Sequence, residues 1–99
     1  MNKKVKYEIA IKITSLSYLK RRENHLTKFW IHIKDTNISN NLYGFLVEEI
    51  GSKNINLNEE YYALASPLDD LEYTINSELD FGESLHIYGQ VRLLKKLSC

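Results

Sequence analysis

Three histidines are the side chains of this sequence best suited to proton transfer: His25, His32 and His86. His32 and His86 occupy the outward positions of two segments that alternate like β-strands, and Lys34 follows His32 on the same face. If those strands are neighbours, one imidazole could accept a proton while the other donates one, as in the cleavage of RNA. Two solvent-exposed histidines with no chemical role are the simpler interpretation of the same spacing.

Other catalytic and metal-binding patterns are missing from the sequence. It contains no His-x-x-x-His, Cys-x-x-Cys or Gly-x-Ser-x-Gly motif, and its four glycines are scattered. Asp69, Asp70 and Glu72 could hold a hard cation, although a solvated acidic turn explains them as well. We therefore predict that the protein is not an enzyme and needs no metal or cofactor.

The charges are sorted into blocks along the chain. Residues 1–34 hold nine Lys/Arg and two Glu (net +7), residues 35–91 one Lys and eleven Asp/Glu (net −10), and residues 92–99 three bases (net +3), which cancel to zero. So acidic a middle indicates either a basic partner or simple solubility. The carboxylates predicted to meet a partner are Glu48, Glu49, Glu59, Glu60, Asp69, Asp70 and Glu72.

Aromatic residues on the polar side of the predicted strands suggest a second contact surface. Trp30, His32, Tyr88 and Arg92 should all project from that side, and Trp, Tyr and Arg dominate binding hot spots. We predict that Trp30 and Tyr88 contact a partner. The alternative is that a helix or second sheet covers this face, which would make Trp30 a core residue.

Strands must position these side chains, because period-two alternation dominates both ends of the chain. Residues 4–13 alternate strictly, less cleanly to residue 19, and residues 27–34 alternate again before an Asx turn at Asp35. A charged loop near residue 22 predicts that these two strands pair with each other. Residues 71–81 and 85–94 predict a C-terminal hairpin with Leu85, Ile87, Val91 and Leu93 inward, and Gly89 where a neighbouring ring or backbone comes close.

The middle of the chain is ambiguous. Residues 39–51 favour a helix with a Leu42, Phe45, Leu46 and Ile50 stripe, although Gly44 and the alternation of its neighbours also fit a strand. Residues 54–57 suggest a short strand, and residues 58–65 fit either type before Ser66-Pro67 ends the segment. The sequence predicts one mainly β domain over residues 1–99: an antiparallel curled sheet or small sandwich with one short helix near residues 40–50.

The expected location is the cytoplasm. Lys6, Glu8 and Lys12 interrupt every early apolar run that could serve as a signal peptide, and no stretch approaches the length of a membrane span. The only cysteine is Cys99, which rules out an intrachain disulfide.

Three features of the sequence together suggest a known class of protein. They are the single β-rich domain, the strands at residues 4–13 and 85–94, and the acidic block from Glu48 to Glu83. Over its whole length the chain resembles, in architecture, the small cytoplasmic immunity proteins of contact-dependent growth inhibition and related bacterial toxin systems. The resemblance implies a non-catalytic inhibitor that binds one toxin domain, often a nuclease, in a one-to-one complex. The acidic surface would then cover the basic active site of the toxin.

A small β-barrel that binds nucleic acid is the alternative function. Nine bases within residues 1–34 could follow a phosphate backbone while Trp30 and Tyr88 stack on bases. The unbalanced acids of the middle block oppose that field. We therefore expect a protein partner, and neither a membrane nor direct nucleic-acid binding.

Overall fold

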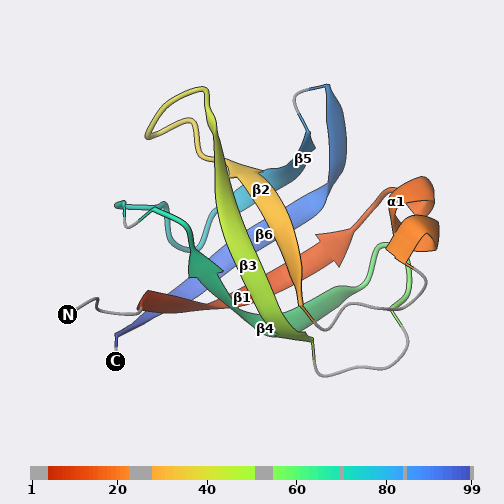
Figure 1. The fold of residues 1–99 in the computed structure, drawn as a ribbon, viewed down its shortest axis with the longest axis horizontal. Coiled ribbons are helices and arrows are strands. Elements are labelled where there is room, and N and C mark those ends of the chain that lie inside the picture. The colour runs from red at the N-terminus through yellow and green to blue at the C-terminus, as the bar shows by residue number, and fades with distance from the viewer. Residues whose placement is uncertain (1–4, 23–27, 51–54, 70, 84, 99) are drawn as a thin grey trace.

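The chain folds into a closed antiparallel β-barrel with one short helix, which confirms the prediction of a mainly β fold (Figure 1). This computed structural model describes residues 5–22, 28–50, 55–69, 71–83 and 85–98. Their elements are β1 (Val5–Ile13), α1 (Leu16–Arg22), β2 (Phe29–Lys34), β3 (Leu42–Ile50), β4 (Glu60–Pro67), β5 (Glu78–Glu83) and β6 (His86–Ser98). The strand order around the barrel is β1-β4-β3-β2-β5-β6, and β6 pairs with β1 to close it.

The alternation of the first strand is confirmed, because its apolar side fills the barrel. Tyr7, Ile9, Ile11 and Ile13 are each at most 1% exposed. Ile9 lies between Ala63 of β4 and Leu93 of β6 in the ladder, so β1 is hydrogen-bonded on both sides. The inward side of β2 is equally well buried, through Phe29, Ile31 and Ile33.

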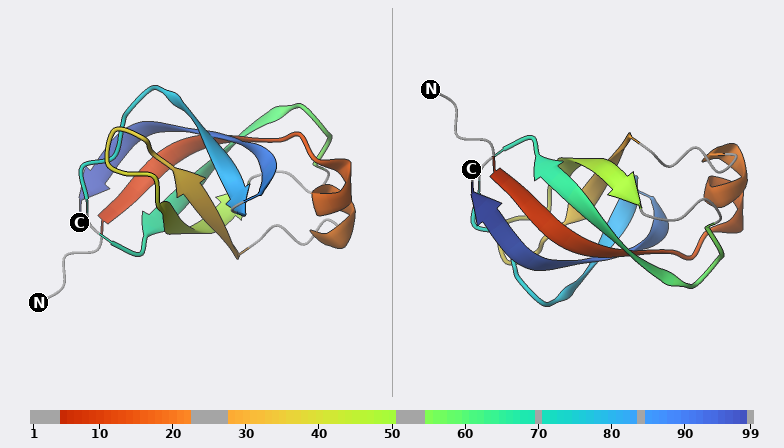
Figure 2. Two further views of the ribbon diagram at one scale, coloured as in Figure 1. Left: turned by 90° about the horizontal axis from the view of Figure 1, so that it is seen from above. Right: turned by 90° about the horizontal axis from the view of Figure 1, so that it is seen from below.

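The predicted pairing of the first two strands is wrong. β1 pairs with β4 and β6, whereas β2 pairs with β3 and β5. Residues 15–19, expected to prolong the first strand, instead begin α1, since Ser15 Oγ accepts a hydrogen bond from Tyr18 N at 3.3 Å. α1 lies at one end of the barrel, opposite the end where β1 begins and β6 stops (Figure 2). The helix therefore diverts the chain away from β1 before β2 begins.

The helix predicted over residues 39–51 is wrong, because this segment contains β3. Phe45 and Val47 are buried, and β3 pairs with β2 on one side and β4 on the other. Two neighbouring strands supply ladder partners that a helix would not use. The short helix of the fold is α1, outside the predicted range.

Two other segments also differ from prediction. Ile55 to Leu57 lie in a loop and not in a strand, while residue 54 lies outside the described residues. Asn58 follows with a φ of 65°, and β4 begins at Glu60, so the strand alternative holds for most of residues 58–65. Residues 71–76 are not a strand, and β5 begins only at Glu78.

The C-terminal hairpin is confirmed by the pairing of β5 with β6. Gly89 is the close approach that the sequence predicts, since a Cβ there would lie 2.0 Å from Lys12 O and 2.7 Å from the Phe81 ring. The inward assignment of Leu85 and Ile87 is wrong, because these side chains are 88% and 58% exposed. The hairpin extends beyond the barrel core, so its tip has no interior to face.

Candidate binding site beside β2 and β5

A slit separates β2 from β5 along part of their length. The two strands pair only at Ile33↔Phe81 and Lys34↔Asp80. A regular antiparallel ladder would continue to His32↔Gly82 and Ile31↔Glu83, but neither pair forms. A hollow of about 210 Å³ occupies this position, lined by Tyr18, Trp30, Ile31, His32, Phe81, Gly82, Glu83 and Tyr88.

A bulge at Gly82 opens the slit. The register of β5 against β6 shifts between Phe81 and Gly82. A Cβ at Gly82 would lie 2.0 Å from His86 O, so only glycine allows the two strands of the hairpin to approach so closely there. β-bulges bend the strand that carries them. In Figure 1 the β5–β6 hairpin accordingly extends away from β2.

The slit brings together three of the four residues predicted to share an outward face. Trp30, His32 and Tyr88 all line it, although β2 and β6 are not neighbours in the barrel. Trp30 is 47% exposed, so it is not the core residue of the alternative prediction. Arg92 lies elsewhere, with its Nη2 3.0 Å from Glu60 Oε1 on β4.

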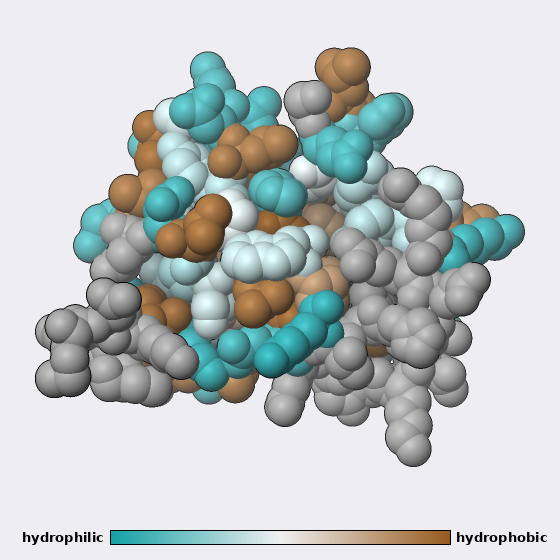
Figure 3. Space-filling model, in the orientation of Figure 1, coloured by the Kyte–Doolittle hydropathy of each residue, from teal (hydrophilic) through white to brown (hydrophobic). Residues whose placement is uncertain are grey.

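An apolar surface adjoins the slit on the outer side of β2 and β3. Trp30 and Leu68 both lie beside Gly44, where an added Cβ would be 3.7 Å from Leu68 Cβ and 3.8 Å from Trp30 Cε3. Leu68 is 69% exposed, and Leu42 lies two residues before Gly44 on the same face of β3. We call Trp30, Leu42 and Leu68 the Trp30 surface. Figure 3 shows apolar side chains over this β2–β3 face.

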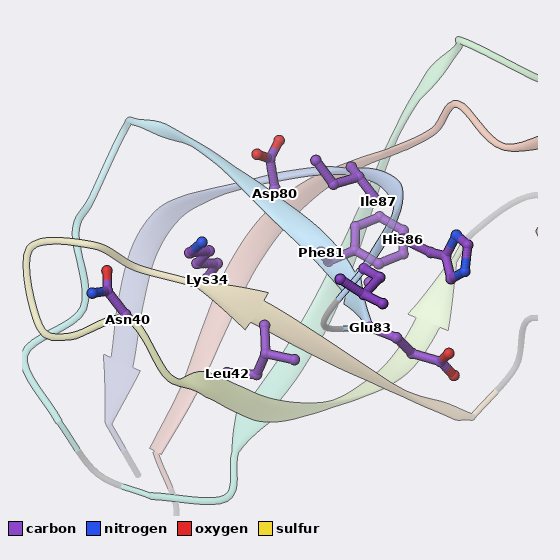
Figure 4. A pocket seen from close by; sticks show the side chains of 10 residues that line it. Lys34, Asn40, Leu42, Asp80, Phe81, Glu83, His86 and Ile87 are labelled. Atoms are coloured by element: carbon purple, nitrogen blue, oxygen red, sulfur yellow. The ribbon is translucent and has the colours of Figure 1, made fainter.

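A second hollow, of about 390 Å³, lies beside the slit, between the end of β2 and the β5–β6 hairpin. Figure 4 shows Lys34, Asn40 and Leu42 on its β2–β3 side, with Glu83, His86 and Ile87 on the hairpin side. The two hollows adjoin each other along β5, because Phe81, Gly82 and Glu83 line both of them.

The two histidines of the hypothetical ribonuclease site occupy different hollows. His32 lines the slit and His86 lines the larger hollow, and β5 lies between the strands that carry them. Among the hydrogen bonds and ion pairs of the described side chains, none joins one histidine to the other. His25 lies outside the described residues.

Bases lie beside two of the carboxylates predicted to face a partner. Lys6 Nζ is 2.8 Å from Glu48 Oε2, and Arg92 bonds Glu60. Glu59 accepts hydrogen bonds from Asn56 and Tyr61. Because a base neutralises two of these three carboxylates, they do not form one uninterrupted acidic patch.

The remaining predicted acids lie in the connection between β4 and β5. Asp69 and Glu72 are exposed, Asp70 lies outside the described residues, and the side chain of Glu49 is not described either. Asp69 directly follows Leu68, so it borders the Trp30 surface. Glu83 lines both hollows, and its carboxylate makes no hydrogen bond or ion pair with another described residue.

The described residues hold no cluster suited to a metal ion: no three His, Cys, Asp or Glu side chains gather there as metal ligands would. No helix there has the length and apolar character that crossing a membrane requires.

Sequence reasoning did not identify Tyr18, Leu42 and Leu68 as members of the site, and it named Glu83 only as the last residue of the acidic block. Tyr18 was assigned to a strand, although Ser15 three residues earlier is a helix-capping signal. Leu68 follows Ser66-Pro67 in a loop, and only the fold places it beside Trp30. The chain matches no protein-family model, no curated protein and no solved structure, so the geometry of the site is the basis for its function.

Proposed function

We propose that this protein is a non-catalytic inhibitor that binds a basic protein surface, as a toxin-neutralising immunity protein does. The observation that supports it most is the exposed Trp30 beside a slit whose carboxylate, Glu83, has no ion-pair partner among the described residues. Trp is enriched in binding hot spots, where it fills a well-packed, desolvated position at the centre of an interface. A large exposed side chain of this kind gains free energy when a partner removes it from water.

Charge favours a basic partner. Asp69 borders the Trp30 surface and Glu83 lines the slit, and neither carboxylate has a described ion-pair partner. Acids at the edge of an apolar contact accelerate association with a cationic surface and fix its orientation. The acids of the middle block that bases already neutralise, such as Glu48 and Glu60, would contribute less.

Replacement of Trp30 tests this proposal. We expect Trp30→Ala to weaken a reconstituted one-to-one complex about 30-fold, or about 2 kcal/mol, because a hot-spot ring loses its contact area. Candidate partners are the toxin domain encoded by a neighbouring gene and proteins captured from the source cell. The supporting measurement is calorimetric titration of two purified proteins.

The matched control is Tyr62→Ala. Tyr62 is 66% exposed on β4 and lines neither hollow, so its loss should leave the affinity within about twofold. If both variants bind as the wild type does, the Trp30 surface is not the interface. If no purified protein forms a complex with the wild type, the proposal itself is wrong.

The absence of catalysis is a separate prediction. Purified protein at micromolar concentration should leave RNA intact, and a fluorescent oligonucleotide should show no steep salt-dependent binding, because described bases such as Lys6 and Lys12 lie beside acids. Cleavage lost on His32→Ala or His86→Ala would contradict this, as would a steep salt slope.

A further inference from the structure

We infer that the slit binds an extended segment of the partner, hydrogen-bonded along β2, with an arginine side chain placed between Trp30 and Tyr88 against Glu83. This inference rests on the proposed function, because it states how the partner is recognised. Three properties of the slit support it: an unpaired strand edge, aromatic walls and a carboxylate.

The strand edge comes from the missing ladder between β2 and β5. Trp30 to His32 have partners on β3, but among the described residues they have no ladder partner on the β5 side. Backbone N–H and C=O groups along such an edge can accept an added strand. An extended peptide would use these groups in the way that other sheet edges bind peptides.

The aromatic walls favour a cation over an apolar side chain. Trp30 and Tyr88 line the slit, and Tyr18 stacks on Tyr88 with ring centroids 4.5 Å apart and an interplanar angle of 19°. Aromatic faces attract a cation placed above them. A purely apolar side chain would gain burial from these rings but would leave Glu83 without an opposite charge.

Among the described residues, Glu83 is the one carboxylate that lines the slit, and none of the residues that line it is a Lys or Arg. An arginine can stack on an aromatic face and bond a carboxylate through two parallel N–H groups, which a lysine cannot do. The slit therefore has the chemistry of an arginine site. Its hollow of about 210 Å³ is of a size suited to one large side chain.

A short peptide tests the inference without knowledge of the partner. The probe is an acetylated and amidated hexapeptide of valine and threonine with one central arginine, and the comparison peptide carries citrulline, which has nearly the same shape without the charge. Trp30 is the only tryptophan of the chain, so its fluorescence reports binding at the slit. We expect the arginine peptide to bind at least about tenfold more tightly than the citrulline peptide.

Two further comparisons locate the contact. Glu83→Gln should reduce the affinity for the arginine peptide about tenfold, whereas Glu8→Gln, which removes an exposed acid of β1 outside both hollows, should not change it. Two further peptides are N-methylated at alternate amides, one at the odd and one at the even positions. At least one of them should bind about tenfold more weakly, because its methyl groups remove the N–H donors that face β2.

Several outcomes would overturn the inference. They are equal binding of the arginine and citrulline peptides, no change in Trp30 emission at about 5 mM peptide, equal effects of Glu83→Gln and Glu8→Gln, or unchanged affinity of both N-methylated peptides. If these occur while Trp30→Ala still weakens the complex with a purified partner, the proposed function stands and only this mode of recognition fails. If the peptide binds as expected but no partner complex forms, the slit is a peptide site and the inhibitor proposal fails.

Discussion

Gly89→Ala is expected to lower the free energy of unfolding by about 3 kcal/mol or more. A methyl group at this position would lie 2.0 Å from Lys12 O, 2.7 Å from Phe81 Cε1 and 3.0 Å from Ile13 Cα. Two of these three atoms belong to the backbone of β1, which the ladders with β4 and β6 hold in place. The clash can be relieved only by separating strands, so the cost should exceed that of ordinary overpacking.

Gly44→Ala is the matched control for this prediction, since both glycines lie inside strands. Its nearest neighbours would be 3.7 and 3.8 Å away, which is normal van der Waals contact. We expect a change within about 1 kcal/mol, in either direction. Chemical denaturation of both variants, monitored by circular dichroism, measures the difference, and equal losses would contradict the close approach at Gly89.

The predictions that succeeded depend on local pattern and burial. The inward positions of β1 are apolar and its outward positions mostly polar, so its inward residues could be named, although Ala10 on the outward side is also buried at 2% exposure. The same reasoning placed Trp30 and His32 outward on β2, and the turn at Asp35 was identified because an Asx side chain bonds its own backbone.

The failures occur where long-range contacts decide the structure. Leu42, Phe45, Leu46 and Ile50 fit a helical stripe, and only the neighbouring strands β2 and β4 turn this segment into β3. The partners of β1 could not be predicted either, since α1 follows β1 and the next strand, β2, pairs elsewhere in the barrel. No local signal reports that change of direction except the cap at Ser15.

The candidate site was predictable only in part for the same reason. Trp30 and Tyr88 could be predicted as contact residues because Trp and Tyr are enriched in binding hot spots. The slit itself depends on a register shift at Gly82, which a single sequence does not show. The charge pattern predicted the site less well than the aromatic residues did. The acids of the middle block are close together in the sequence, but in the fold Lys6 and Lys12 of β1 and Arg92 of β6 pair with three of them.

Asp35 connects this site to the stability of the barrel. It directly follows β2 and is fully buried, with 0% exposure. Its carboxylate accepts hydrogen bonds from Asn37 N at 3.1 Å, Thr74 N at 2.7 Å and Thr74 Oγ1 at 2.9 Å. The side chain therefore fastens the turn after β2 to the connection that precedes β5.

We expect Asp35→Ala to cost about 3 kcal/mol of unfolding free energy, because it removes three hydrogen bonds to a charged acceptor and leaves donors near the core unpaired. Asp35→Asn should cost less, since its amide oxygen can still accept one of these bonds while its NH₂ group opposes another donor. Asp69→Ala, an exposed acid in the same connection, should change stability by less than about 0.5 kcal/mol. Urea unfolding of the three variants should give this order, and an Asp35→Ala protein as stable as Asp69→Ala would show that the buried carboxylate does not hold β2 and β5 in register.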